Sequence, residues 1–239
     1  MAVYNIAGLR VKMKCRPGGR IEKQAAAYLD ENQNDENIDI TIDVSDERIR
    51  EFTEKNMPST ENEWEYVLTG ADFYNALVNF DGMVLHSSCV VHDGFAYAFS
   101  AHSGTGKSTH TQLWLKHFND TNTYILNDDK PALRILDDQI YAFGTPWSGK
   151  RNISVNTGVP LKSICFIDRA EQNSIKRIDI KKAIFNVLDQ TTRQLDTAPM
   201  NKLFDFMDKI FEKVKMYEMG CNMTDEAVQV SYTRMSEDD

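Results

Sequence analysis

The chain has 239 residues, a formal net charge of −9 at pH 7, 41% hydrophobic residues and 26% charged residues. This length is enough for one large domain, or for a catalytic core with a smaller lobe, that folds without disulfide bonds. The acidic balance argues against a nucleic-acid-binding protein, because such proteins normally present an excess of Lys and Arg. No apolar run approaches the roughly 20 residues that span a bilayer, and the four cysteines are scattered. We therefore expect a cytoplasmic protein with reduced thiols that binds neither nucleic acid nor a membrane.

The first eighty residues predict a small N-terminal α+β lobe. Alternating patterns and turn residues predict strands at 4–7, 9–14 and 38–44, and helices at 21–29, 45–55 and 64–80. Pro58 and its polar neighbours predict a flexible connection over residues 57–62. We expect residues 1–80 to form this lobe and residues 81–239 to form a catalytic domain.

The sequence pattern of residues 81–239 predicts a mixed α/β fold with a hairpin-rich sheet. A β-rich run at 84–92, the turn Asp93-Gly94 and a second run at 95–100 indicate a hairpin. Further strands are expected at 124–126, 132–136, 140–143 and 161–167, and helices at 107–118, 180–189, 202–214 and 224–235. This order differs from the alternating strands and helices of a doubly wound parallel sheet.

Residues 101–109 read Ala-His-Ser-Gly-Thr-Gly-Lys-Ser-Thr and match the phosphate-loop pattern G-x-x-x-x-G-K-[ST], with Ala101 in place of the first glycine. The glycines let the backbone N–H groups curl around phosphate oxygens. Lys107 would place a charge on the β- and γ-phosphates, Ser108 would offer a hydroxyl to Mg²⁺, and the following helix would aim its positive end at the anion. The alternative is a glycine-rich turn with an accidental lysine. The residues predicted to bind the nucleotide are Ser103, Gly104, Thr105, Gly106, Lys107, Ser108 and Thr109.

Asp128 and Asp129 follow the first strand expected after the loop helix. Phosphoryl transfer to a hydroxyl needs metal ligands and a base, and adjacent aspartates at a strand end can divide these roles. The alternative is a pair of solvated turn residues. His86, at the start of the predicted hairpin, is a weaker candidate, because a strand histidine is more often a satisfied polar residue than a catalytic one.

The compact turn at 144–151 carries the adjacent cations Lys150 and Arg151. Either cation could close over the phosphates and stabilise transferred charge. The alternative is a tight surface turn with a packed tryptophan. Arg169, after the strand at 161–167, is a similar but weaker candidate.

Together, His86, the hairpin, the loop at 101–109 and the Asp128-Asp129 pair resemble the catalytic domain of the HPr serine kinase/phosphorylase family, which is similar to phosphoenolpyruvate carboxykinase. The resemblance covers residues 82–149 well and the C-terminal third loosely. It implies a kinase that uses ATP and Mg²⁺ to phosphorylate a serine hydroxyl. By this resemblance Asp128 would be the base, with Asp129 and Ser108 on the metal side.

The chain also departs from that family. Thr109 stands where these kinases usually carry an acidic residue, and no stretch matches their metal-binding glutamate. These departures leave the acceptor open: a serine on a small protein or peptide, or a small molecule. The chain looks more like shorter, stand-alone HPr kinase-like proteins.

Two other functions stay open. One is an ATP-binding sensor with little turnover, which the missing glutamate suggests. The other is carboxykinase-like chemistry on a small acid, which the short chain and the lack of an evident set of anion-binding arginines disfavour. The choice between ATP and GTP, and whether the chain forms a homo-oligomer, are not indicated by the sequence.

Overall fold

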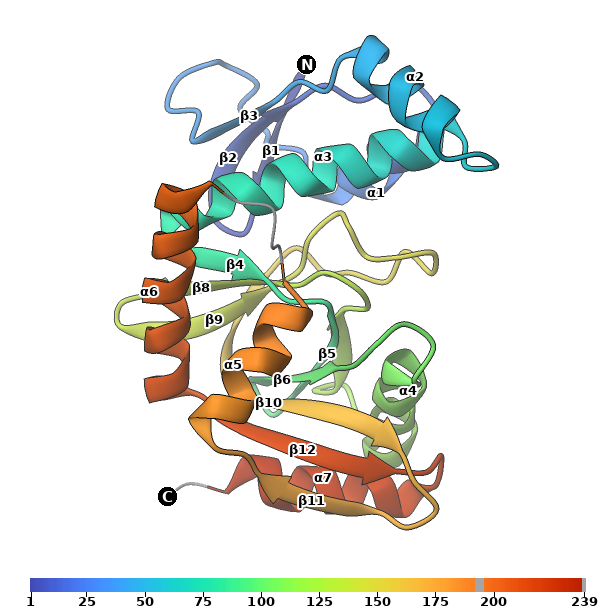
Figure 1. Cartoon of the computed structure of the whole chain (residues 1–239), viewed down its shortest axis with the longest axis vertical. Helices are drawn as coiled ribbons and strands as arrows, with labels where there is room; N and C mark the ends of the chain where they lie inside the picture. Colours follow the sequence, from blue (N-terminus) through green and yellow to red (C-terminus); the bar gives the residue numbers. More distant parts are fainter. Residues whose placement is uncertain (192–195, 238–239) are drawn as a thin grey trace.

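Two β-sheets organise the chain, and the computed structural model describes residues 1–191 and 196–237 (Figure 1). The smaller sheet has three strands, and the larger, mixed sheet has nine. The predicted mixed α/β class is therefore confirmed. Among the described helices, none is long and apolar enough to cross a membrane.

The smaller sheet and its helices come from the first eighty residues. The strands β1 and β2 form an antiparallel hairpin, and β3 lies parallel to β2. The elements are β1 (Ala2–Ile6), β2 (Leu9–Met13), α1 (Arg20–Ala25) with a 3-10 turn (Ala26–Tyr28), β3 (Ile40–Ile42), α2 (Asp46–Lys55), and α3 (Glu61–Leu77) with a second 3-10 turn (Val78–Phe80). A capping box between Thr60 and Glu63 starts α3. The flexible connection expected at 57–62 is thus wrong at its end, because α3 already begins at Glu61.

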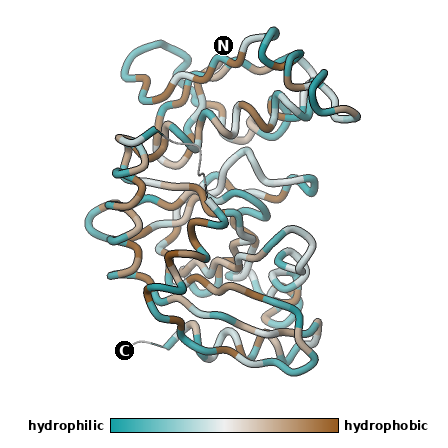
Figure 2. The backbone as a smooth tube through the Cα atoms, in the orientation of Figure 1, coloured by the Kyte–Doolittle hydropathy of each residue, from teal (hydrophilic) through white to brown (hydrophobic). Residues whose placement is uncertain are grey.

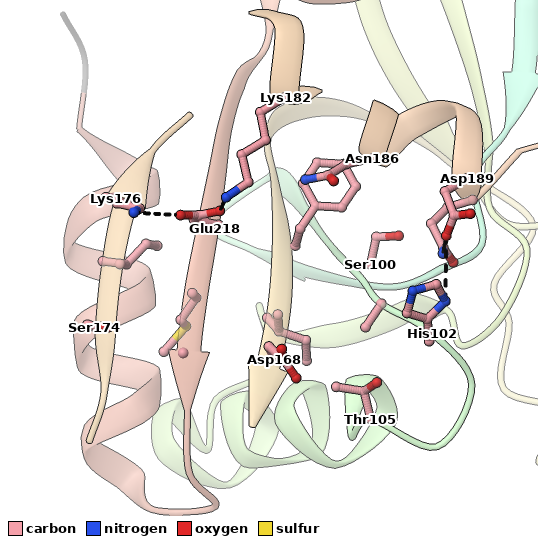
Figure 3. A pocket seen from close by; sticks show the side chains of 17 residues that line it. Ser100, His102, Thr105, Asp168, Ser174, Lys176, Lys182, Asn186, Asp189 and Glu218 are labelled. Carbon is pink, nitrogen blue, oxygen red and sulfur yellow. Dashed lines mark hydrogen bonds and ion pairs between the residues drawn. The ribbon is translucent and has the colours of Figure 1, made fainter. Parts of the chain in front are cut away.

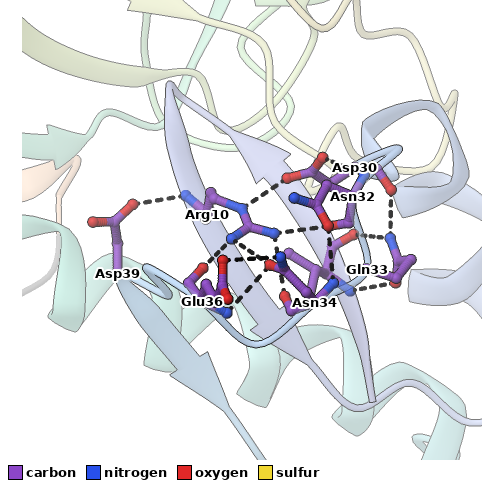
Figure 4. Close-up of polar contacts among 8 residues, drawn as sticks. Arg10, Asp30, Asn32, Gln33, Asn34, Glu36 and Asp39 are labelled. Atoms are coloured by element: carbon purple, nitrogen blue, oxygen red, sulfur yellow. Dashed lines mark hydrogen bonds and ion pairs between the residues drawn. The ribbon is translucent and has the colours of Figure 1, made fainter.

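The polar segment between the first 3-10 turn and β3 is held by Arg10 of β2 (Figure 4). The Arg10 guanidinium donates to Asp30 Oδ2 at 2.9 Å and to the Asn32 carbonyl at 2.7 Å, while its backbone N–H donates to Asp39 Oδ2 at 2.8 Å. Arg10 therefore holds much of this loop against β2.

The larger sheet runs in the order β4-β8-β9-β10-β6-β5-β7, with β12 on β10 and β11 on β12. Its strands are β4 (Gly82–Val84), β5 (Ser87–His92), β6 (Phe95–Ser100), β7 (Tyr124–Asn127), β8 (Ala132–Leu136), β9 (Gln139–Phe143), β10 (Gly158–Arg169), β11 (Ser174–Arg177) and β12 (Lys215–Cys221). The predicted β5–β6 hairpin is confirmed. The strands β6, β10 and β12 are parallel to one another, so their carboxyl ends lie at one edge.

Helices cover both faces of the parallel strands. The helices are α4 (Lys107–Phe118), α5 (Ile180–Asp189), α6 (Thr197–Lys213) and α7 (Asp225–Ser236). Apolar residues of α4 and α7 pack on one face, and those of α5 and α6 pack on the other. In Figure 2 the apolar residues of α5 and α6 accordingly form brown stretches beside the sheet.

In the larger sheet and its helices, three further expectations differ from the structure. The run at 84–92 is two strands, because β4 pairs with β8 whereas β5 pairs with β6 and β7. The strands β11 and β12 were not expected. The helix α6 begins at Thr197 instead of residue 202, because Pro199 falls in its first turn, where proline is tolerated.

One hydrophobic cluster joins the first eighty residues to the larger sheet. It contains residues of β1–β3 and α1–α3 together with Ala132, Phe143 and Trp147. The division of the chain at residue 80 into a lobe and a catalytic domain stays a prediction.

Candidate functional site

The residues 101–106, here called the glycine loop, connect β6 directly to α4. Gly104 and Gly106 have φ angles of +80° and +130°, a region that side chains rarely adopt. A Cβ added at either position would meet no atom within 4 Å, so the loop borders open space there. Ala101 is buried in the cluster beneath the loop.

Lys107 lies inside the glycine loop. Its Nζ atom donates to the carbonyls of Ala101 at 2.8 Å and His102 at 3.4 Å, and the residue is buried. Burial lowers the pKa of Lys107, and the negative charge of Asp129 opposes that shift. The glycine loop thus surrounds the Lys107 ammonium group, which donates hydrogen bonds to carbonyls of the loop.

Arg169, at the end of β10, supports the loop from outside. Its guanidinium donates to the carbonyls of Gly104 at 2.6 Å and Thr105 at 3.0 Å. These contacts tie the loop to the neighbouring strand.

The two candidate aspartates directly follow the last residue of β7, in a turn that is held by hydrogen bonds. The Asn127 Oδ1 atom accepts from the backbone N–H groups of Asp129 at 3.0 Å and Lys130 at 2.7 Å. The Asn127 amide nitrogen donates to the Thr145 carbonyl at 3.0 Å. Asn127 therefore fixes the backbone turn that carries Asp129, a role that the sequence did not reveal.

Asp128 points under the first turns of α4. Ser88 of β5 donates to Asp128 Oδ1 at 2.7 Å, and Thr111 of α4 is hydrogen-bonded to the same Ser88 hydroxyl at 2.7 Å. Arg151 Nη1 lies 3.7 Å from Asp128 Oδ2, and only 4% of the Asp128 side chain is exposed. Ser88 and Thr111 also escaped the sequence analysis, because isolated hydroxyl residues carry no motif.

Asp129 is the more accessible carboxylate, with 26% of its side chain exposed. Its Oδ1 atom lies 3.3 Å from His86 Nε2 and 3.2 Å from Lys130 Nζ. Burial raises the pKa of Asp129, but the hydrogen bond from His86 and the charge of Lys130 outweigh burial, so the pKa lies below its usual value. His86 is itself held by Gln190, whose Oε1 lies 3.0 Å from His86 Nδ1.

The turn at 144–151 reaches this site with one of its two cations. Arg151 approaches Asp128, whereas within residues 1–191 and 196–237 no ion pair joins Lys150 to either aspartate. The pKa of Glu63 in α3 is lowered mainly by its hydrogen bond from the Thr60 N–H, and the charge of Lys150 adds a smaller contribution. The expected packed tryptophan is present: Trp147 is fully buried and stacks on Phe73 at 4.8 Å.

Two side chains from the first eighty residues are hydrogen-bonded to this turn at Gly149. Tyr66 accepts from the Gly149 N–H at 3.0 Å, and Gln24 Nε2 donates to the Gly149 carbonyl at 2.9 Å. A Cβ on Gly149 would lie 3.1 Å from the Asp129 Cβ. Two side chains of the N-terminal part therefore hold a peptide that packs against a candidate catalytic carboxylate.

Neither a family model nor a curated protein matches the chain. Among solved structures, it is similar to the Hpr(Ser) kinase/phosphatase from Coxiella burnetii, with 10% sequence identity and a TM-score of 0.38. The match covers 65% of this chain and 99% of that chain. At this level the similarity supports no conclusion about function.

Proposed function

We propose that the chain is a kinase that moves the γ-phosphate of ATP to a hydroxyl group, on a serine of a small protein or peptide or on a small molecule. The observation that carries the proposal is the glycine loop, with Lys107 inside it and the carboxylates of Asp128 and Asp129 at the end of a strand in the same sheet. The Ser88 hydroxyl is hydrogen-bonded to both Asp128 and Thr111 of α4, the helix that begins at Lys107, so Asp128 lies beside that helix.

The glycine loop offers the groups that a triphosphate needs. The backbone N–H groups of residues 103–109 and the N-terminus of the 12-residue helix α4 provide positive ends of dipoles. Lys107 adds a full charge. When the triphosphate binds, the Lys107 ammonium group would contact phosphate oxygens in place of the carbonyls of Ala101 and His102.

The residues also fit Mg²⁺. No group of three or more His, Cys, Asp or Glu side chains placed to hold a metal occurs within the described part of the chain. Mg²⁺ usually needs only one or two carboxylates plus substrate phosphates, so this finding is compatible with it. Ser108 and Asp128 would hold the ion, which would neutralise charge on the phosphates.

The carboxylate exposures favour Asp129 as the proton acceptor, the reverse of the division that the family resemblance implies. A base must touch the acceptor hydroxyl, and Asp128 is almost fully enclosed. Within the described residues the Asp129 Oδ2 atom receives no hydrogen bond, since His86 and Lys130 both contact Oδ1. In the transfer, a bond forms between the hydroxyl oxygen and the γ-phosphorus. The bond to the β,γ-bridging oxygen breaks, and the hydroxyl proton moves to Asp129.

ATP binding in the presence of Mg²⁺ tests the first half of the proposal. Lys107→Met should weaken ATP binding by about 10- to 100-fold, because hydrogen bonds to charged groups contribute about 1.5–3 kcal/mol. Lys116→Met is the matched control, since Lys116 is exposed on the same helix and should leave affinity unchanged. Wild-type affinity in Lys107→Met would refute the proposal.

Transfer of labelled γ-phosphate to acceptors in a cell extract tests the second half. Asp129→Asn should keep ATP affinity within a few-fold and abolish labelling, whereas Asp128→Asn should raise the Mg²⁺ concentration required. The opposite pattern would restore Asp128 as the base. Tight ATP binding without any labelled acceptor would favour the sensor function.

A further inference from the structure

A cavity of about 560 Å³ lies against the glycine loop, between α5 and the ends of β10, β11 and β12 (Figure 3). The loop itself forms one wall, through Ala101, His102 and Thr105. This volume lies within the range of small-molecule sites, about 300–1,000 Å³. None of the residues assigned to phosphate transfer, Asp128, Asp129 and His86, lines this cavity.

The sheet order places the loop between the cavity and the aspartates. The strand β6, which leads into the loop, has β5 and then β7 on one side and β10 and then β12 on the other. Asp128 and Asp129 follow β7, whereas the cavity lies at β10 and β12. In open α/β sheets, ligands bind beyond the carboxyl ends of the parallel strands. A triphosphate with its γ-phosphate at the aspartates therefore has its other end directed toward the cavity.

The chemistry of the lining suits an uncharged, flat ligand. Two lysines and three carboxylates line the cavity, and Glu218 is paired with both Lys176, at 2.8 Å, and Lys182. The formal charge of this lining is therefore negative, which disfavours a phosphate group. The aromatic ring of Phe166 and the apolar side chains of Ile175 and Met219 complete the wall.

One polar group in the cavity lacks a partner within the described residues. The Asn186 side-chain amide of α5 makes no hydrogen bond to residues 1–191 or 196–237, and Figure 3 shows it facing the same space as Ser100. An amide offers both a donor and an acceptor, the combination that reads the edge of a nucleobase.

We propose that this cavity binds the base and ribose of the nucleotide whose phosphates occupy the glycine loop, an inference that rests on the proposed function. The base stacks on Phe166 and its edge meets the Asn186 amide. The nucleotide thus runs from the cavity, across the loop, to Asp129.

The test compares the affinities for ATP and for inorganic tripolyphosphate. Phe166→Ala and Asn186→Leu should each weaken ATP binding, by about 5- to 150-fold for the aromatic residue, and leave tripolyphosphate binding unchanged. Asn186→Leu should also change the ratio of ATP to GTP affinity. Phe185→Ala is the matched control, because Phe185 lies exposed on α5 and does not line the cavity.

The outcomes separate the two proposals. Wild-type ATP affinity in both variants, or equal affinity of the wild type for ATP and tripolyphosphate, would overturn the nucleoside cavity and leave the phosphate-binding loop intact. A wild type that binds neither ligand would overturn the proposed function itself. Variants that change only phosphate transfer to the acceptor would assign the cavity to the acceptor instead. Because Phe166 also packs against the core, Asn186→Leu keeps the test valid if Phe166→Ala does not fold.

Discussion

The hydrogen bonds that Tyr66 and Gln24 make with Gly149 predict that, in the proposed kinase, the Tyr66 hydroxyl affects the rate of phosphate transfer although it lies outside the proposed catalytic residues. Tyr66→Phe removes the oxygen that accepts from the Gly149 N–H, while it keeps the ring beneath the Arg20 guanidinium, 3.7 Å away. Burial raises the pKa of Tyr66 to about 12, so this hydroxyl is neutral at physiological pH. The substitution therefore changes one hydrogen bond and no charge.

The expected loss of stability follows from the Gly149 N–H group, which loses its hydrogen-bond acceptor in Tyr66→Phe. The Gly149 N–H is only partly buried, so loss of its hydrogen bond in Tyr66→Phe should lower the free energy of unfolding by about 0.5–1.5 kcal/mol. Gln24→Leu should cost less, because the Gln24 Oε1 atom is buried without a partner among the described residues and its removal relieves that penalty. Since Gly149 packs against Asp129, a displacement of about 1 Å there should slow transfer up to about 100-fold.

Urea unfolding and the transfer rate at saturating ATP measure the two effects. Tyr66→Phe should slow transfer with little change in ATP affinity, and the double variant with Gln24→Leu should deviate from additivity, because both side chains hold one peptide. Tyr141→Phe, in β9, is the control for loss of a hydroxyl. A Tyr66→Phe protein that is destabilised but transfers phosphate at the wild-type rate would show that Gly149 does not position Asp129.

Two further predictions concern stability. Trp147→Ala should lower the free energy of unfolding by about 3–5 kcal/mol, because it empties a fully buried site. Trp147→Phe should lower it less, because the smaller ring can still stack on Phe73. Equal losses of stability for the two variants in urea unfolding would contradict this packing. Asp129 has a lowered pKa in the folded protein, so its stabilisation should be complete above the ordinary carboxyl pKa of 3.8 and lost as the pH falls through the lower folded value. The stability difference between wild type and Asp129→Asn should therefore shrink only in that acidic range, and a difference that is flat with pH would rule out the lowered pKa.

Local patterns predicted most of the elements. The Asp93-Gly94 turn between two β-rich runs indicated the β5–β6 hairpin, and the strand–loop–helix around Lys107 followed from the glycine spacing. The strand β12 escaped because its pattern lacks strict alternation: Met216 and Tyr217 are both buried, and Lys215 and Glu218 add charges. Its place beside β10 depends on pairing between distant segments, which no local window contains.

The candidate site was predicted only where a motif exists. The glycine spacing indicated Lys107, and a position after the first strand beyond the loop helix indicated Asp128 and Asp129; the roles of all three stay proposals. The hydroxyl of Ser88 and the grip of Tyr66 on Gly149 depend on tertiary contacts between residues far apart in the chain. Single polar residues of this kind occur throughout any sequence, so nothing distinguishes them before the fold is known.

The strand β10 pairs with three other strands, and these pairings affect the order in which the sheet folds. The start of β10 pairs antiparallel with β9, and its end lies parallel to both β6 and β12, which are distant in sequence. Such non-local pairings are slow to form, because loop-closure entropy is lost before the contacts compensate for it. The β5–β6 hairpin can form early, but Arg169 meets the glycine loop only after β10 has docked on β6. Nucleotide binding should therefore appear late in refolding, after the hairpin that precedes the loop.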